Sequence, residues 1–298
     1  MIRKIILSGL FILSPFMVSA QGMIDGFMRG GGKGVVALSY STEDYKEFYK
    51  GTNLVSEPNL GTISTQSISL FAAIGLMNNV DLVVSLPYVT TSADKGYWAD
   101  QSAMQDAGFA LKWRPLLMTI ENVGTISGIV SAGLATPLSN YVADAPVAVG
   151  HQSTSGDFRV LGNFMTDFGL FASVQAGYIR RGDVNLDHVT LDGNMKTSVP
   201  DALDISAKIG YGNSDFYIDA WYQNQTARGG TNIGDTGASF PSNGISFSRI
   251  GVTGYYPLPI LNKQLGISIG GASTLDGRNI GKSTRISFGV VYGLTLWE

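Results

Sequence analysis

The segment 285–296, near the carboxyl terminus, alternates between apolar residues and mostly small or polar residues. The apolar set occupies the even positions, which are Ile286, Phe288, Val290, Tyr292, Leu294 and Leu296. The other set occupies the odd positions, which are Arg285, Ser287, Gly289, Val291, Gly293 and Thr295. Successive side chains of a β-strand point to opposite faces, whereas a helix would mix the two sets. The pattern therefore predicts a strand with one apolar face.

The same period recurs along the chain, and the connections between periodic segments alternate in length. The other segments lie at about 34–41, 67–74, 82–88, 108–114, 123–136, 157–165, 170–178, 203–211, 216–223, 245–256 and 264–273. The short connections are 75–82, 115–122, 165–169, 210–215 and 256–264. The long polar ones are about 42–60, 91–105, 137–156, 181–199, 225–244 and 274–283. This regularity predicts an all-β, antiparallel, up-and-down transmembrane β-barrel of about twelve strands, with both termini on the short-turn side.

A soluble β-sandwich or a lipocalin-like barrel is the alternative to a transmembrane barrel. A soluble sheet places charged residues on its outward face. The ionisable residues inside the periodic segments instead all share the parity of the small and polar positions. A charge that faced lipid near the bilayer midplane would cost about 2–4 kcal/mol. The distribution of charges therefore favours the membrane barrel, with the apolar face of each strand toward lipid.

The amino terminus has the pattern of a secretory signal peptide. Arg3 and Lys4 precede an apolar run at 5–18, and small residues at 18–20 form a cleavage site. A membrane-anchor helix fits less well, because the run is short and Pro15 interrupts it. We therefore expect a signal peptide at 1–20, a Gly-rich leader at 21–33 and the barrel at 34–298. The leader could form a plug through Met23, Phe27 and Met28, or remain a flexible periplasmic segment.

Composition narrows the class of protein further. The chain has no cysteine, which excludes disulfides, a lipoprotein anchor and thiolate metal sites. Its formal net charge is −3 without a basic stripe, which argues against nucleic acid as a partner. The expected partners are outer-membrane lipid, a small-molecule solute and, during insertion, the barrel-assembly machinery. This combination is typical of the outer membrane of a Gram-negative bacterium.

The segment 75–89, GLMNNVDLVVSLPYV, resembles a turn and strand of the outer-membrane barrel family named after the MetA pathway of phenol degradation. The segments 108–116 and 133–141 fall where that family has its next two strands, and the resemblance covers roughly 34–297. The resemblance implies a porin or transporter, often linked with hydrophobic or aromatic solutes.

Charged and aromatic residues on the inward parity are the candidate functional residues. They are Lys112, Arg114, Arg159, Asp204, Lys208, Tyr217, Asp219, Trp221, Arg249 and Arg285, together with Asp157, Gln175 and Gln223. One interpretation is a filled, salt-bridged interior, since buried charges persist when they are paired. The other is a solute path, in which the excess of cations favours anionic solutes and the aromatic rings favour aromatic ones.

Catalytic and metal sites have weaker support. His151, Ser153 and Asp157 suggest a Ser/His/Asp arrangement, but the only other histidine is His188 and these residues are typical of a solvated loop. The segments 182–187 and 191–194 carry carboxylates without the spacing of a Ca²⁺ loop. The segment 29–34 lacks the spacing of a phosphate-binding loop. We therefore expect neither cofactor, nor metal, nor catalytic residue.

These observations predict a passive channel or transporter for small solutes. Two other functions remain open. A structural or adhesive barrel would act through its external loops, and a barrel hydrolase would need a catalytic group that the sequence does not single out.

Overall fold

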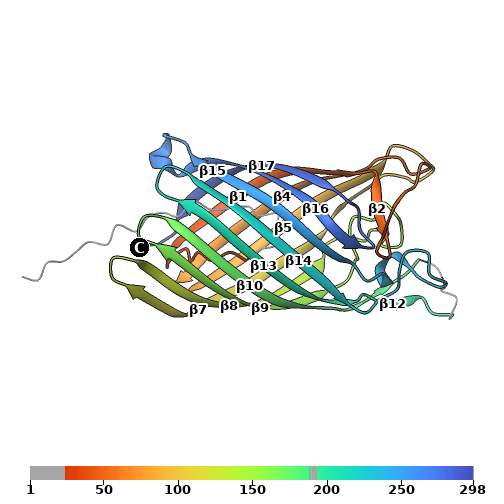
Figure 1. Ribbon diagram of the computed structural model, residues 1–298, viewed down its shortest axis with the longest axis horizontal. Coiled ribbons are helices and arrows are strands. Elements are labelled where there is room, and N and C mark those ends of the chain that lie inside the picture. The colour runs from red at the N-terminus through yellow and green to blue at the C-terminus, as the bar shows by residue number, and fades with distance from the viewer. Residues whose placement is uncertain (1–23, 188, 190–192, 298) are drawn as a thin grey trace, which may run out of the picture.

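Twelve antiparallel strands form a closed β-barrel in the computed structural model, which describes residues 24–187, 189 and 193–297 (Figure 1). The barrel strands are β1 (Lys33–Tyr45), β4 (Ile63–Met77), β5 (Val80–Ala93), β7 (Asp106–Ile120), β8 (Gly124–Pro137), β9 (Ser155–Thr166), β10 (Leu170–Arg181), β13 (Asp201–Gly212), β14 (Tyr217–Arg228), β15 (Ser246–Pro257), β16 (Leu265–Arg278) and β17 (Thr284–Thr295). Neighbours in the sequence pair with each other, and β1 closes the ring by pairing with both β4 and β17. The predicted fold is confirmed. The predicted signal peptide at 1–20 lies outside the described residues.

The long connections gather at one end of the barrel, the loop end, and the short ones at the other, the turn end (Figure 1). The loop-end connections contain β2 (Glu47–Lys50), β3 (Asn53–Ser56), β6 (Gln101–Met104), β11 (Asp183–Asn185), β12 (Lys196–Ser198) and the 3₁₀ turn η1 (Phe240–Ser242). A second 3₁₀ turn, η2 (Leu261–Lys263), connects β15 and β16 at the turn end. Within the described part of the chain, no helix has both the length and the apolar character needed to cross a membrane.

The two faces of each strand differ as their alternation predicts. On the outer face Leu38 is 55% exposed, and Ile68 and Ile209 are exposed as well. On the inner face Ala37 and Val83 are buried. An exposed belt of aliphatic and aromatic side chains suits lipid, because hydrocarbon does not penalise it as water does.

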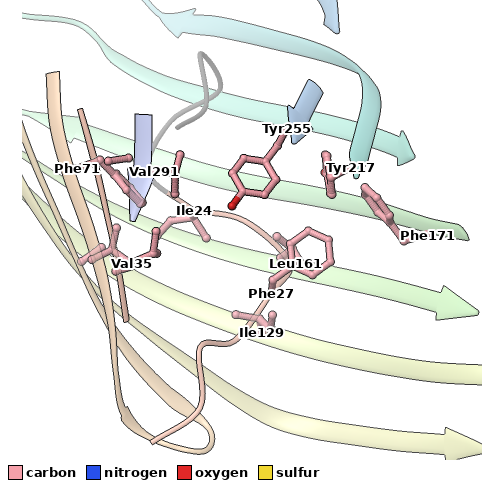
Figure 2. Packing of buried hydrophobic residues seen from close by; sticks show 14 residues of the cluster. Ile24, Phe27, Val35, Phe71, Ile129, Leu161, Phe171, Tyr217, Tyr255 and Val291 are labelled. Atoms are coloured by element: carbon pink, nitrogen blue, oxygen red, sulfur yellow. The ribbon is translucent and has the colours of Figure 1, made fainter. Parts of the chain in front are cut away.

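The interior of the barrel is packed rather than empty at the turn end. Buried apolar side chains from the strands meet there and form one cluster. Its larger strand members are Val35, Phe71, Ile129, Leu161, Phe171, Tyr217, Tyr255 and Val291, which Figure 2 shows around residues from the amino-terminal side of β1. The apolar cluster thus narrows the lumen at the turn end.

Candidate functional site in the barrel interior

The segment Ile24–Arg29, called here the lumenal segment, lies inside the barrel at the turn end (Figure 2). Ile24 and Phe27 are each 8% exposed and belong to the apolar cluster of the strands. The Phe27 ring meets the rings of Phe171 and Tyr217 edge to face, with centroids 5.2 and 6.1 Å apart. Such contacts add to the free energy gained by removing the ring from water.

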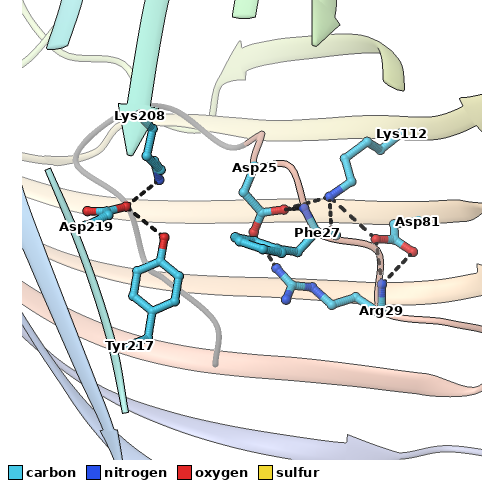
Figure 3. Close-up of polar contacts among 8 residues, drawn as sticks. All are labelled: Asp25, Phe27, Arg29, Asp81, Lys112, Lys208, Tyr217 and Asp219. Atoms are coloured by element: carbon cyan, nitrogen blue, oxygen red, sulfur yellow. Dashed lines mark hydrogen bonds and ion pairs between the residues drawn. The ribbon is translucent and has the colours of Figure 1, made fainter. Parts of the chain in front are cut away.

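Ion pairs fix the lumenal segment to the barrel wall (Figure 3). The Asp25 carboxylate accepts hydrogen bonds from Arg29 Nη2 at 2.6 Å and from Lys112 Nζ at 2.8 Å. Asp81 of β5 accepts the backbone N–H of Arg29 at 3.1 Å and lies 3.6 Å from Lys112 Nζ. Lys112 and Asp81 are almost completely buried, so each charge depends on its partners.

The chain reaches the lumen by passing over the turn between β4 and β5. The N–H of Gly31 donates to Asn78 Oδ1 at 3.1 Å, and the N–H of Gly32 donates to the carbonyl oxygen of Gly75 at 2.9 Å. A side chain at Gly75 would collide with the backbone of Gly30, so this close approach requires glycine. The GLMNN turn therefore holds the chain where it bends into the barrel.

A second cluster lies on β13 and β14 beside the lumenal segment (Figure 3). Lys208 Nζ is 2.9 Å from Asp219 Oδ2, and the Tyr217 hydroxyl donates to the same oxygen at 2.8 Å. Asp219 and Tyr217 are each 2% exposed. All three residues are sequence candidates, and cross-strand pairing brings them together.

A third cluster joins β9, β13 and β14. Arg159 pairs with Asp157 through Nε and with Asp204 through Nη1, both at 2.8 Å. Gln223 Nε2 donates to the other oxygen of Asp204 at 2.6 Å. Asp204 is fully enclosed, and this set of donors compensates its loss of hydration.

A fourth cluster lies toward the loop end, around Glu43 of β1. Arg249 Nη2 donates to Glu43 Oε1 at 2.8 Å, and Arg285 Nε donates to Oε2 at 2.7 Å. Ser283 also donates to Oε1, at 2.5 Å. Two guanidinium groups and a hydroxyl thus converge on one carboxylate.

Two further candidates differ in setting from these clusters. Trp221 is 4% exposed and packs over Gly251, where any side chain would overlap the indole ring. Arg114 lies at the turn end, where its Nη2 donates to the carbonyl oxygen of Asn78 at 3.1 Å beside a register shift in β7. Gln175, the remaining candidate, is buried on β10.

The ion-paired interior contains acids that the sequence analysis did not single out. Its carboxylates are Asp25, Glu43, Asp81, Asp157, Asp204 and Asp219, and its cations are Arg29, Lys112, Arg159, Lys208, Arg249 and Arg285. The two sets are equal in number, so these clusters do not carry the positive surplus counted from the sequence. Glu43 and Asp81 share the inward parity of their strands, a signal that extending each alternating segment by a few residues would have found.

The residues considered for catalysis have separate partners, and Asp157 lies in β9 rather than in a loop. Ser153 Oγ donates to the carbonyl oxygen of Gly182 at 2.8 Å, and Asp157 pairs with Arg159. Burial and the nearby Arg181 lower the pKa of His151 to about 4, so its ring is neutral at pH 7.

His188 and part of the segment 191–194 lie outside the described residues. Asp183, considered for Ca²⁺, instead pairs with Lys196 at 3.1 Å.

Comparison with solved structures supports the fold. The COG4313 outer membrane channel from Pseudomonas putida F1 superposes with a TM-score of 0.68 at 13% identity, over 92% of this chain and 100% of that chain. The NanC porin gives a TM-score of 0.46 at 9% identity, over 86% of this chain and 100% of that chain. No protein-family model matches the sequence, and the search of curated proteins finds no match. The superposition on the COG4313 channel shows that this chain has the fold of an outer-membrane β-barrel.

Proposed function

We propose that this protein is a passive channel for small solutes in the outer membrane of a Gram-negative bacterium. The observation that carries the proposal is the contrast between the two faces of the closed barrel. The outer face is an exposed apolar belt, and the inner face bears paired charges along the wall. A barrel of this kind satisfies its backbone in lipid and leaves a polar interior for passage.

Small aromatic molecules are the solutes that we propose for this channel. Support comes from the inward rings of Tyr217 and Trp221, whereas the guanidinium groups of Arg249 and Arg285 are paired with Glu43 and give no surplus of positive charge for an anion. The resemblance of segment 75–89 to the MetA-pathway barrel family is consistent with the same solutes, and we propose membership in that family.

The lumenal segment would act as the plug of this channel. It occupies the turn end of the interior, so a solute can cross only when Ile24–Arg29 moves aside. Asp25 is the charged anchor that a single substitution can remove, because this carboxylate pairs with Lys112 on the wall and with Arg29 within the segment. The carbonyl oxygen of Phe27 and the N–H of Arg29 also bond the wall, through Lys112 and Asp81. Weakening that anchor should therefore favour the open state.

Asp25→Asn tests the channel and the plug together. It keeps the shape of the side chain but removes the charge that holds Lys112. In planar bilayers we expect the wild type to conduct and the variant to show a several-fold higher open probability. Asp215→Asn is the control, because it removes a carboxylate of similar pairing distance, 2.8 Å to Lys263, on the exposed turn between β13 and β14.

The results separate the two parts of the proposal. Equal open probabilities for the wild type and Asp25→Asn would contradict the plug. Folded barrels that never conduct, in either form, would contradict the channel and leave a structural or adhesive role.

A further inference from the structure

A cavity of about 340 Å³ lies at the loop end of the barrel, between four of the long connections. This volume is near the lower end of the range for small-molecule sites, which begins at about 300 Å³. The apolar and aromatic residues that line it include Phe48, Ile63, Ala145, Ala148, Phe240 and Ile280. Ile63 and Ala145 also belong to a small apolar cluster beneath the loops, which gives the cavity a packed wall.

The cavity also has a polar side. Tyr45, His151 and Glu43 all border it. Among the described residues, no hydrogen bond from the protein occupies the Tyr45 hydroxyl or the His151 ring, so both are available to a ligand. Glu43 differs, because its carboxylate already accepts hydrogen bonds from Arg249, Arg285 and Ser283.

We propose that this cavity binds a small, uncharged molecule with an apolar ring system and one hydrogen-bonding group. The rings of Phe48 and Phe240 would contact the apolar part of the ligand, and Tyr45 or His151 would bond its polar group. A neutral imidazole can donate or accept, so an alcohol or a phenol hydroxyl suits it.

The charges of the groups that border the cavity do not favour an anionic ligand. The ionisable groups that border the cavity are Glu43, Tyr45 and His151, and burial keeps the imidazole uncharged at neutral pH. The two guanidinium groups near Glu43 are directed at its carboxylate rather than at the cavity. A carboxylate bound in the cavity would therefore lose hydration without gaining a cation.

This proposal rests on the channel function in one respect. In the channel, the cavity would be the first site that a solute occupies on its path. Below it, Glu43 and Ser283 also border a narrow gap beside Trp221 and Arg249. The order from the loop end inward is thus the cavity, the Glu43 cluster and then Trp221. A ligand bound in the cavity would therefore lie above the Glu43 cluster. The ion pairs of that cluster would have to separate before the ligand could pass.

Equilibrium dialysis with matched probes tests the assignment. The purified barrel in detergent is dialysed against 2-naphthol or 2-naphthoate at pH 7, and protein-free micelles supply the blank. The two probes share a ring system and differ in charge. We expect saturable binding of 2-naphthol and at least about tenfold weaker binding of 2-naphthoate.

Two variants place the binding in the cavity. Ala148→Trp fills it and should abolish binding of 2-naphthol, whereas Val142→Trp, on an exposed position of the same connection, should leave it unchanged. His151→Ala keeps the cavity open and should weaken binding about three- to tenfold, the value of one hydrogen bond. If Ala148→Trp does not fold, the His151 variant and the probe pair still decide the question.

The outcomes separate this assignment from the channel. If the barrel binds 2-naphthol but never conducts, the cavity proposal stands and only the channel proposal is contradicted. Conduction without saturable binding, equal binding of the two probes, or binding that survives both cavity variants would overturn the cavity proposal.

Discussion

At the scale of single residues, the stability of the barrel interior depends on the pairing of buried charged side chains. The Lys112 side chain is 1% exposed, and its Nζ lies 2.8 Å from Asp25 Oδ1 and 3.6 Å from Asp81 Oδ2. Its inward position could be predicted from strand parity alone. Its partner Asp25 could not, because that residue belongs to a segment without periodicity, and only the folded barrel brings the two together.

Replacing Lys112 tests how much stability the buried pairs provide. Lys112→Met keeps the length of the side chain but removes the cation beside Asp81 and leaves Asp25 paired with Arg29 alone. Breaking a buried pair costs about 3–5 kcal/mol. We expect the free energy of unfolding to fall by that order in urea titrations, followed by the loss of the fast-migrating folded band on unboiled gels.

Lys263→Met is the matched control for this change. Lys263 lies at the same distance, 2.8 Å, from a carboxylate, but its side chain is 48% exposed and that of its partner Asp215 is 67% exposed. Water and salt screen such a pair, so little change is expected. Equal effects of the two substitutions would show that burial does not govern these pairs.

At the scale of elements, the number and order of the strands could be predicted, whereas the sequence left the leader at 21–33 as either a plug or a flexible periplasmic segment. Each strand has lipid on one side and the interior on the other, so its sequence must alternate throughout its length. The predicted turn at 165–169, for example, corresponds to the connection between β9 and β10. The segment Ile24–Arg29 has no such constraint, and its place follows from contacts with distant residues such as Asp81.

The position of the elements across the membrane can be tested with single cysteines, because the chain has none of its own. Asn53 lies in the β2–β3 hairpin at the loop end, and Asn79 lies in the turn between β4 and β5. Both are exposed. Long loops of outer-membrane barrels face outward, so an impermeant thiol reagent on intact cells should label Asn53→Cys and not Asn79→Cys.

Permeabilised cells are the control for this experiment, since both cysteines should then react. Labelling of Asn79→Cys alone on intact cells would show that the barrel has the opposite orientation in the membrane. Labelling of neither in permeabilised cells would indicate that these turns are covered.

At the scale of the whole molecule, the interior is divided along the barrel axis. The turn end combines an apolar cluster with the lumenal segment, and the loop end combines the Glu43 cluster with the cavity above it. Cations alone would suggest an anion-selective path, as the sequence did. The acids that the structure adds balance those cations, so we expect only weak selectivity between simple ions in the wild type.

The Glu43 cluster provides a direct test, because its charges can be removed from either side. Glu43→Gln leaves Arg249 and Arg285 without their carboxylate, which should shift the reversal potential in a KCl gradient toward anion preference. Replacing both arginines by Gln leaves the carboxylate alone, which should shift it toward cation preference. Both shifts should shrink as salt rises, because mobile ions screen exposed charges. The same reversal potential for the wild type and both variants, all folded by gel migration, would place the ion path away from Glu43.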